Sequence, residues 1–219
     1  MGKTARIGVL LFGPVESPEE QARRSTGWFW QAMKELGWVY GQNIVVDRRY
    51  GESLDQLRAA AADLVRLKVD VLYAPSAGFA KLLQLETRTI PIVVVGSGGD
   101  LVAAGLVANL ARPGGNLTGV QIRNDDLVPK RLEFLKALVP NLSRVAFLQE
   151  DAITTVVVPQ MVALYQQQAA EAASTLGLKI HRVIVHRPDE FPAAFRDMTN
   201  TRDQGLMIFG TPFFRPASG

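Results

Sequence analysis

Ser76 stands in the sequence context that comes closest to a catalytic motif. Residues 74–78 (Ala-Pro-Ser-Ala-Gly) join a predicted strand to a predicted helix, which is where the nucleophile elbow of a serine hydrolase places its serine. The first glycine of that motif is an alanine here, and a catalytic triad would also need a histidine on a late loop. The alternatives are a helix cap whose hydroxyl and following backbone N–H groups bind an anion such as a carboxylate, or a purely structural turn.

Histidine and cysteine chemistry is scarce in this chain. It has no cysteine and two histidines, His181 and His186, so thiol catalysis, iron–sulfur clusters and thiolate zinc sites are excluded. The histidines lie within or just beyond one predicted strand, and their spacing places them on opposite faces of it. They therefore cannot form one metal site, and we expect them at surface or edge positions.

A glycine-rich loop at residues 96–99 (Gly-Ser-Gly-Gly) invites a nucleotide-binding interpretation. The dinucleotide fingerprint needs a further glycine at position 101, where Leu101 stands, and it follows the first strand of a fold instead of the fourth. A turn that needs positive φ is the simpler interpretation. The chain also lacks a phosphate-loop motif, so no cofactor is predicted.

Aromatic and acidic side chains at the predicted strand ends are further candidates. Phe12, Phe79 and Phe213 could stack on a ligand, although core packing is the usual fate of phenylalanine. Glu150 and Asp151 follow the first strand of the second half of the chain. A carboxylate there could pair with a ligand ammonium, or it could be an exposed loop charge.

The first predicted helix carries two tryptophans that cannot both face the core. Phe29 and Met33 share the face that we expect to pack inward, and Trp28 and Trp30 do not both belong to that stripe. At least one indole is therefore expected to be exposed or to contact a partner.

The elements that must position these residues alternate regularly between strand and helix. Short, β-branched apolar segments are typical of strands covered on both faces, and the helices begin at capping residues and end at glycine or proline. The expected strands are residues 7–12, 44–50, 69–74, 90–95, 117–121, 144–148, 179–185 and 206–209. The expected helices are residues 17–37 (opened by a Ser-Pro-Glu-Glu capping box), 53–67, a segment from about residue 76, 125–139, 159–176 and 188–200.

This order predicts an α/β fold with two doubly wound parallel sheets. The strongest break, at residues 112–116 (Arg-Pro-Gly-Gly-Asn), separates an N-terminal lobe, residues 1–119, from a second lobe, residues 120–219. Ligands of open α/β sheets lie beyond the carboxyl ends of the strands. The candidate loops are therefore residues 13–17, 75–79, 96–100, 149–151 and 210–213.

Composition and charge exclude several classes of protein. The 219 residues are 47% hydrophobic and 21% charged, which is typical of a globular chain that buries a sizeable core. The net charge of +3 is scattered, with no run of more than two basic residues, so no nucleic-acid partner is expected. No stretch reaches the ~18 apolar residues of a membrane span, and the apolar run at residues 7–12 is too short for a signal-peptide core.

Residues 105–120 carry the most specific motif of the chain. The run Gly-Leu-Val-Ala-Asn-Leu-Ala-Arg-Pro-Gly-Gly-Asn-Leu-Thr-Gly-Val, with weaker matches at residues 36–44, 61–65, 69–71 and 130–133, resembles a family of bacterial ABC-transporter substrate-binding proteins related to tryptophan/tyrosine periplasmic binding proteins. The resemblance implies a type I periplasmic-binding fold, in which two α/β lobes close on a small organic ligand such as an aromatic or other amino acid. It implies a binding protein and not an enzyme.

By position, the resemblance implies ligand contacts at the strand ends. These candidates are Gly13, Ser17, Ser76, Ala77, Phe79, Ser97, Asp100, Gln121, Glu150 and Thr211. The implied partners are an ABC permease and its ATPase, and the implied location is periplasmic or extracellular with a lipid anchor.

The resemblance also sets expectations for the two ends of the chain. Family members begin with a secretion signal, which is absent here, and continue past residue 219, so the second lobe is expected to be incomplete at its C-terminus. The effector domain of a transcription regulator shares this fold. It would need a helix-turn-helix before the first strand, whereas only about six residues precede that strand.

Overall fold

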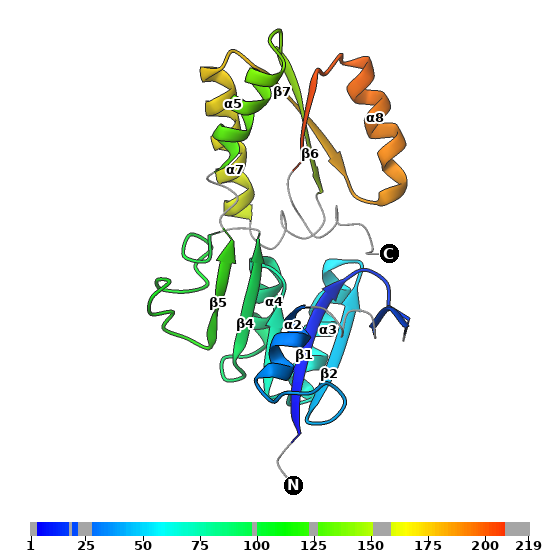
Figure 1. Ribbon diagram of the computed structural model, residues 1–219, viewed down its shortest axis with the longest axis vertical. Helices are drawn as coiled ribbons and strands as arrows, with labels where there is room; N and C mark the ends of the chain where they lie inside the picture. Colours follow the sequence, from blue (N-terminus) through cyan, green and yellow to red (C-terminus); the bar gives the residue numbers. More distant parts are fainter. Residues whose placement is uncertain are drawn as a thin grey trace. The chain divides into compact units, whose positions relative to one another are not determined.

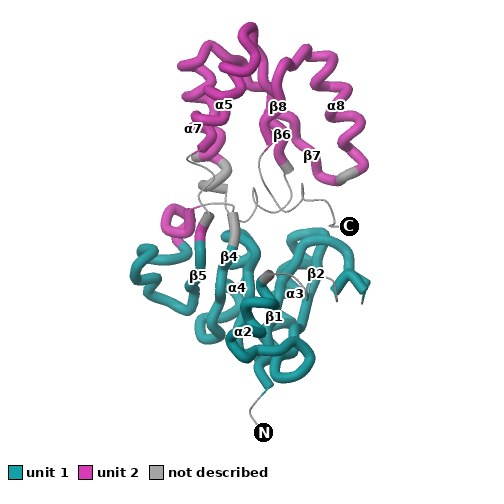
Figure 2. The backbone as a smooth tube through the Cα atoms, in the orientation of Figure 1, with its two compact units in different colours: residues 1–96, 106–120 teal, residues 97–105, 121–219 magenta. Residues whose placement is uncertain are grey.

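Two units, each built around its own sheet, make up the chain. The computed structural model describes residues 4–17, 19–21, 28–97, 100–122, 127–150 and 159–208. Lobe one comprises residues 1–96 and 106–120, and lobe two comprises residues 97–105 and 121–219 (Figure 2). The sequence predicted a single boundary after residue 119. In the structure residues 97–105 also belong to lobe two, so the chain enters lobe two, returns to lobe one at residue 106 and leaves it again after residue 120.

The sheet of lobe one has the strand order β2-β1-β3-β4-β5. Each of the pairs β1–β2, β1–β3 and β3–β4 is parallel, as the continuously apolar segments predicted. The strands are β1 (Ala5–Phe12), β2 (Ile44–Gly51), β3 (Val71–Ala74), β4 (Ile92–Ser97) and β5 (Leu117–Ile122) (Figure 1).

Helices lie on both faces of this sheet. They are α2 (Trp28–Glu35), α3 (Leu54–Arg66) and α4 (Ala77–Glu86). The side chains of Leu64 on α3 and Leu72 on β3 meet above Gly8, so α3 covers the Leu72 face. The next residue of β3, Tyr73, points to the opposite face, where its ring centroid lies 6.2 Å from that of Phe29 on α2.

Gly119 allows β5 to approach β4 closely. A Cβ atom at this position would lie 1.8 Å from the carbonyl oxygen of Val94, and the backbone φ of Gly119 is +149°. Both observations require glycine, because L-residues with a side chain rarely adopt this conformation. Gly119, which belongs to the motif at residues 105–120, is therefore a packing requirement of lobe one.

The sheet of lobe two has the strand order β7-β6-β8, and all pairs are parallel. Its strands are β6 (Arg144–Glu150), β7 (Lys179–Val185) and β8 (Gly205–Ile208). Its helices are α5 (Val128–Leu138), α7 (Pro159–Thr175) and α8 (Phe191–Asn200), the last preceded by the 3₁₀ turn η2 (Pro188–Glu190).

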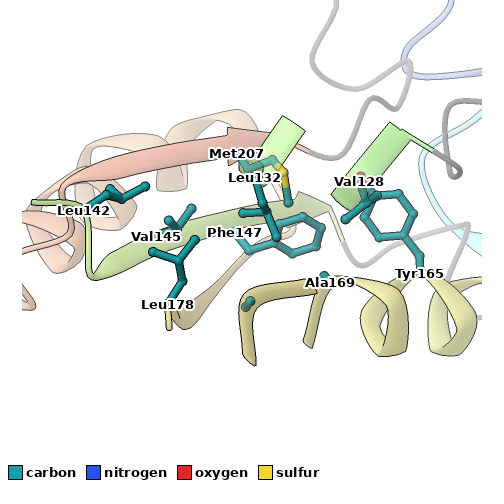
Figure 3. Packing of buried hydrophobic residues seen from close by; sticks show 10 residues of the cluster. Val128, Leu132, Leu142, Val145, Phe147, Tyr165, Ala169, Leu178 and Met207 are labelled. Carbon is teal, nitrogen blue, oxygen red and sulfur yellow. The ribbon is translucent and has the colours of Figure 1, made fainter. Parts of the chain in front are cut away.

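The alternation of β6 side chains gives lobe two a hydrophobic cluster on each face. Val145 and Phe147 pack with α5 and α7, and Ala146 and Leu148 pack with α8. In Figure 3 the first cluster runs from Leu142 at one end to Val128 and Tyr165 at the other, with Phe147 between them. Full burial of side chains of this size contributes about 1.5–3 kcal/mol each.

The other predicted elements are present with small changes at their ends, whereas of the first expected helix, residues 17–37, only residues 19–21 and 28–35 are described as helical and residues 18 and 22–27 lie outside the described residues. The described part contains all eight expected strands, although residue 209 lies outside the described residues. Helix α5 begins at Val128 with Pro129 in its first turn, and residue 125, where its start was expected, lies outside the described residues. Phe29, expected in the core, is 50% exposed, and its ring lies beside those of Trp30 and Tyr73. Within the described residues, no helix is long and apolar enough to cross a membrane.

Candidate functional site

The topology of lobe one places a ligand-binding edge between β1 and β3. Strand β1 continues through α2 to β2 on one side, and β3 continues through α4 to β4 on the other. At such a switch point the loops leaving the two neighbouring strands diverge and open a crevice at their carboxyl ends. The loops at this edge are residues 13–17 and residues 75–76, both of which the sequence pointed to.

The loop at residues 13–17 is held by its own hydrogen bonds. Gly13 has a φ of +115° and donates its N–H to the Gly51 carbonyl at 3.1 Å. Ser17 Oγ accepts from the N–H of Glu20 at 3.3 Å, and Glu20 Oε2 accepts from the N–H of Ser17 at 2.8 Å. This reciprocal pair confirms the predicted capping box. It also engages the Ser17 hydroxyl, so a ligand contact by Ser17 stays a prediction.

Ser76 occupies the N-cap position of α4 without capping it. Its backbone is extended (φ −160°, ψ 170°), but its side chain accepts no hydrogen bond from the helix. Ser53, at the corresponding position of α3, does accept one, from the N–H of Gln56 at 3.3 Å. The expectation that Ser76 caps its helix is thus correct for its position and wrong for its hydroxyl, which accepts no hydrogen bond from the first turn.

The first turn of α4 consequently keeps its N–H groups available. Within the described residues, no group accepts a hydrogen bond from the N–H of Ala77, Gly78 or Phe79. Ala77 and Phe79 are each 3% exposed, so each can offer a ligand little beyond its backbone. Unsatisfied N–H groups and the helix dipole together form an anion-binding position.

Two of the proposed aromatic contacts have different outcomes. Phe79 is buried, so its ring packs in the core of lobe one, as the packing alternative for this residue expected. Its stacking on a ligand stays a prediction, which this burial does not favour. Phe12, the last residue of β1, is partly exposed. Phe213 lies outside the described residues.

Asp100 and Gln121 are brought together by one short segment of lobe two. Asp100 Oδ1 accepts from the N–H groups of Val102 at 2.8 Å and Ala103 at 3.2 Å, so it caps the turn that it begins. Gln121 Oε1 accepts from the N–H of Leu101 at 3.2 Å, while its Nε2 is buried without a partner. An orphaned donor is costly unless something outside the described residues accepts from it, so Gln121 is the stronger candidate of the two.

Three further predicted site residues have no described side chain. Ser97 and Glu150 end β4 and β6, respectively, and their side chains lie outside the described part, as does Thr211 entirely. Beside Glu150, however, Gln149 is 4% exposed. The sequence placed this glutamine in the candidate loop at residues 149–151, of which Glu150 was the predicted contact residue.

The histidines lie in lobe two. The Nδ1 atom of His181 is 2.6 Å from Asp203 Oδ2 and its Nε2 atom is 3.3 Å from Asp197 Oδ2. Thr201 Oγ1 donates to the same Asp203 oxygen at 2.7 Å, and the Asp203 side chain is 2% exposed. This cluster precedes β8, at the amino ends of the strands and away from the carboxyl edge. Among the described residues, no group of three or more histidine or acidic side chains could hold a metal ion.

A hydrolase would need a base that accepts the Ser76 proton. In the described part of the chain no side chain forms a hydrogen bond with the Ser76 hydroxyl, and His181 is engaged by two aspartates. The geometry at Ser76 therefore favours binding of a ligand oxygen over nucleophilic attack.

Comparison with known proteins identifies the family. The sequence model of the family described as "ABC transporter substrate binding protein" matches residues 7–210. This chain belongs to that family. It is a family of solute-binding proteins and not of enzymes, and none of the comparisons supports the serine hydrolase alternative.

A curated relative of this chain is longer than the chain itself. A tyrosine-binding protein of Clostridioides difficile (strain R20291) is 32% identical over 146 residues, which are 65% of this chain and 40% of that protein. The chain therefore spans well under half of that relative.

Solved structures share the fold. A Streptococcus pneumonia ABC domain in complex with L-Trp matches with a TM-score of 0.73 and 22% identity, over 99% of this chain and 68% of that one. A conserved domain protein of Vibrio cholerae matches with a TM-score of 0.68 and 24% identity, over 93% and 64% of the two chains. The predicted α/β fold of the type I periplasmic-binding proteins is thereby confirmed.

Proposed function

We propose that this chain is the ligand-binding part of a solute-binding protein of an ABC importer, and that its ligand is an amino acid or a related aromatic carboxylate. The observation that carries the proposal is the open first turn of α4 at the switch point of lobe one, where Ser76 leaves the helix uncapped. Membership in the family supports the transport role. The tyrosine-binding relative and the L-Trp-bound neighbour support the ligand class.

The binding mode follows from the chemistry of that turn. A ligand carboxylate would accept hydrogen bonds from the N–H groups of Ala77 and Gly78 and from the Ser76 hydroxyl. A negative charge at a helix N-terminus gains about 0.3–1 kcal/mol at exposed positions and up to about 2 kcal/mol where it is partly buried. Glu150 as the partner of a ligand ammonium, and closure of the lobes, stay predictions.

The same proposal assigns partners and location. As in other members of the family, the chain would deliver its ligand to a membrane permease driven by an ATPase, and it would act on the outer side of the cytoplasmic membrane. Gln121, with its unpartnered Nε2, would supply a further hydrogen bond to a ligand oxygen.

A thermal-unfolding titration tests the proposal. L-tyrosine, L-tryptophan and L-leucine are the probes, and we expect at least one of them to raise the melting temperature in a concentration-dependent way. A probe at one hundred times its Kd adds about 2.7 kcal/mol to the free energy of unfolding. If none of these probes changes the melting temperature, the proposed ligand class is wrong.

A pair of serine variants then separates the site from the scaffold. Ser76→Ala should weaken binding of the effective probe roughly ten-fold or more, because a hydrogen bond to a charged group contributes about 1.5–3 kcal/mol, and it should leave stability unchanged because Ser76 does not cap α4. Ser53→Ala, the matched control, removes a true cap and should cost about 1 kcal/mol of stability without changing affinity. Unchanged affinity in Ser76→Ala would refute the anion site, and ester hydrolysis that disappears in this variant would refute a purely binding role.

A further inference from the structure

Phe12 ends a row of β1 side chains that faces helices α3 and α4. The row begins at Gly8, over which the side chains of Leu64 on α3 and Leu72 on β3 meet, and it continues through Leu10, which is fully buried. Alternate residues of a strand share one face, so the Phe12 ring lies on this face as well. Helix α4 packs against α3, so both helices cover the face to which Phe12 points.

The register of β1 places Phe12 beside the open first turn of α4. Val9 of β1 is level with Tyr73 of β3, and carrying this register to the end of β1 brings Phe12 level with Ser76. Neighbouring strands lie about 4.8 Å apart, so the Phe12 and Ser76 backbones are separated by one strand spacing. The ring therefore stands next to the N–H groups that the proposed function assigns to a ligand carboxylate.

On its other side, Phe12 has the first turn of α3 for a neighbour. Phe12 is in register with Gly51 of β2, and a Cβ atom at Gly51 would lie 2.7 Å from the backbone N of Leu57. No side chain of β2 therefore stands between Phe12 and that turn. Ser53 caps α3, whereas α4 keeps its first turn uncapped. Of the two helix ends beside Phe12, the one at α4 thus offers donors for an anion.

The ring of Phe12 is more accessible than the rest of its row. Leu10 is fully buried, whereas Phe12 is partly exposed. The chain leaves β1 for the opposite face of the sheet, where Phe29 of α2 lies beside Tyr73. Phe79, in the first turn of α4, is 3% exposed and belongs to the core. Of the phenylalanines that the structure describes at this edge, Phe12 is therefore the one that a ligand can reach.

An aromatic ring beside an anion-binding turn suits a ligand with two different ends. The turn binds a carboxylate, while the ring offers a surface on which a second aromatic ring packs in offset or edge-to-face geometry. Ligand sites typically combine apolar walls with a few well-placed polar groups. A ligand whose carboxylate and ring are joined by one or two carbon atoms matches the single strand spacing between Ser76 and Phe12.

We propose that the Phe12 ring contacts an aromatic side chain of the ligand and thereby selects aromatic ligands over aliphatic ones. This inference rests on the proposed function, because it adds a specificity-determining residue to the anion position of lobe one. All the residues that carry it belong to lobe one. It also has a consequence that does not require a ligand, since a ring kept for binding contributes less to folding than a core ring does.

Melting temperatures without ligand test this consequence. Phe79→Ala, the matched control, removes a buried ring of the same lobe, and such truncations are among the most destabilising substitutions. Phe12→Ala should lower the melting temperature by much less than the control does. An equal fall in the two variants would overturn the proposal, because it would show that Phe12 is a core residue.

Calorimetric affinities for L-phenylalanine and L-cyclohexylalanine, its saturated analogue, provide the second readout. Both probes carry a carboxylate and a six-membered ring, but only the ring of L-phenylalanine is aromatic. Phe12→Leu should lower the ratio of the two affinities, in favour of the saturated probe, by roughly two- to ten-fold, because it removes one aromatic pair.

Phe29→Leu is the control for this ratio. It removes a half-exposed ring of lobe one from the opposite face of the sheet, so the ratio should equal that of the wild type. A ratio that is unchanged in Phe12→Leu, or that changes equally in both variants, would overturn the assignment of Phe12.

The outcomes distinguish this inference from the proposed function. If the wild-type protein binds L-leucine but neither ring-bearing probe, the role of Phe12 is refuted and the proposed function stands. If it binds none of these amino acids nor those of the preceding titration, the proposed function is refuted for this ligand class, and the selection by Phe12 is refuted with it.

Discussion

Phe147→Ala should destabilise lobe two and leave the stability of lobe one unchanged. Phe147 is 1% exposed and lies in the cluster between β6 and helices α5 and α7, with its ring centroid 5.4 Å from that of Tyr165. Truncation of a fully buried phenylalanine costs about 3–5 kcal/mol. Marginally stable domains have only about 5–15 kcal/mol in total, so this change removes a large part of the stability of lobe two. All the residues of this cluster belong to lobe two, so the substitution removes no packing contact of the cluster from lobe one.

Urea denaturation with two probes measures this effect. All three tryptophans, Trp28, Trp30 and Trp38, belong to lobe one, so their fluorescence follows lobe one, whereas far-ultraviolet circular dichroism follows the secondary structure of both lobes. In Phe147→Ala the dichroism should show an early transition during which the fluorescence is unchanged.

A surface variant in the same lobe provides the control. Phe195 on α8 is 50% exposed, and Phe195→Ala should shift neither transition by more than about 1 kcal/mol. If fluorescence and dichroism moved together in Phe147→Ala, the division into separately stable lobes would be refuted. A loss of less than about 1 kcal/mol in this variant would refute the packing of Phe147 itself, because no fully buried ring is removed at so small a cost.

Two further predictions concern lobe one. Gly119→Ala places a Cβ atom 1.8 Å from a carbonyl oxygen of β4, at a φ of +149°. It should lower the free energy of unfolding of lobe one, measured by fluorescence in urea, by at least the ~1–3 kcal/mol of a strained backbone. An unchanged unfolding midpoint would contradict the close β4–β5 approach. A hydrogen bond from Arg49 on β2 lowers the pKa of the Asp63 carboxyl group, so this carboxylate binds a proton at a higher pH in the unfolded chain than in the folded one. The stability that the ionised Asp63 contributes at neutral pH is therefore lost as the pH falls from about 4. Asp63→Asn should flatten the acid side of a plot of melting temperature against pH, whereas Asp55→Asn, whose carboxylate is 94% exposed, should not; equal acid sides in Asp63→Asn and wild type would rule out this linkage.

The fold could be predicted because its signals are local. Continuous apolar runs, the capping box at Ser17 and Glu20, and the glycines that follow α2 and α7 (Gly37 and Gly177) act over a few residues. The hydrogen bonds of the capping box are present in the structure. Strand and helix alternation then limits the topology to parallel sheets. The weaker predictions were those that depended on packing partners. Phe29 was expected in the core and is half exposed, because the residues on which it packs are set by the whole sheet.

Side-chain roles at the site could be predicted less well. The sequence indicated that Ser76 stands at a helix N-terminus, and the structure agrees; whether its hydroxyl caps that helix depends on a rotamer, and it does not. The link between Asp100 and Gln121 joins residues far apart in the chain through the N–H of Leu101, which no spacing rule reveals.

By itself, the sequence determined the α/β class, the order of the elements, the loops at the carboxyl ends of the strands and the resemblance to substrate-binding proteins. Each depends on short-range periodicity or on a contiguous motif. Only the tertiary structure decided which polar atoms inside the lobes find partners: Gln84 Nε2 donates to the Leu106 carbonyl, whereas Gln121 Nε2 is buried without a partner among the described residues. The physical reason is that burial and hydrogen bonding depend on groups that the fold brings together from distant parts of the chain, and one residue type therefore acts as scaffold in one place and as a candidate binding group in another.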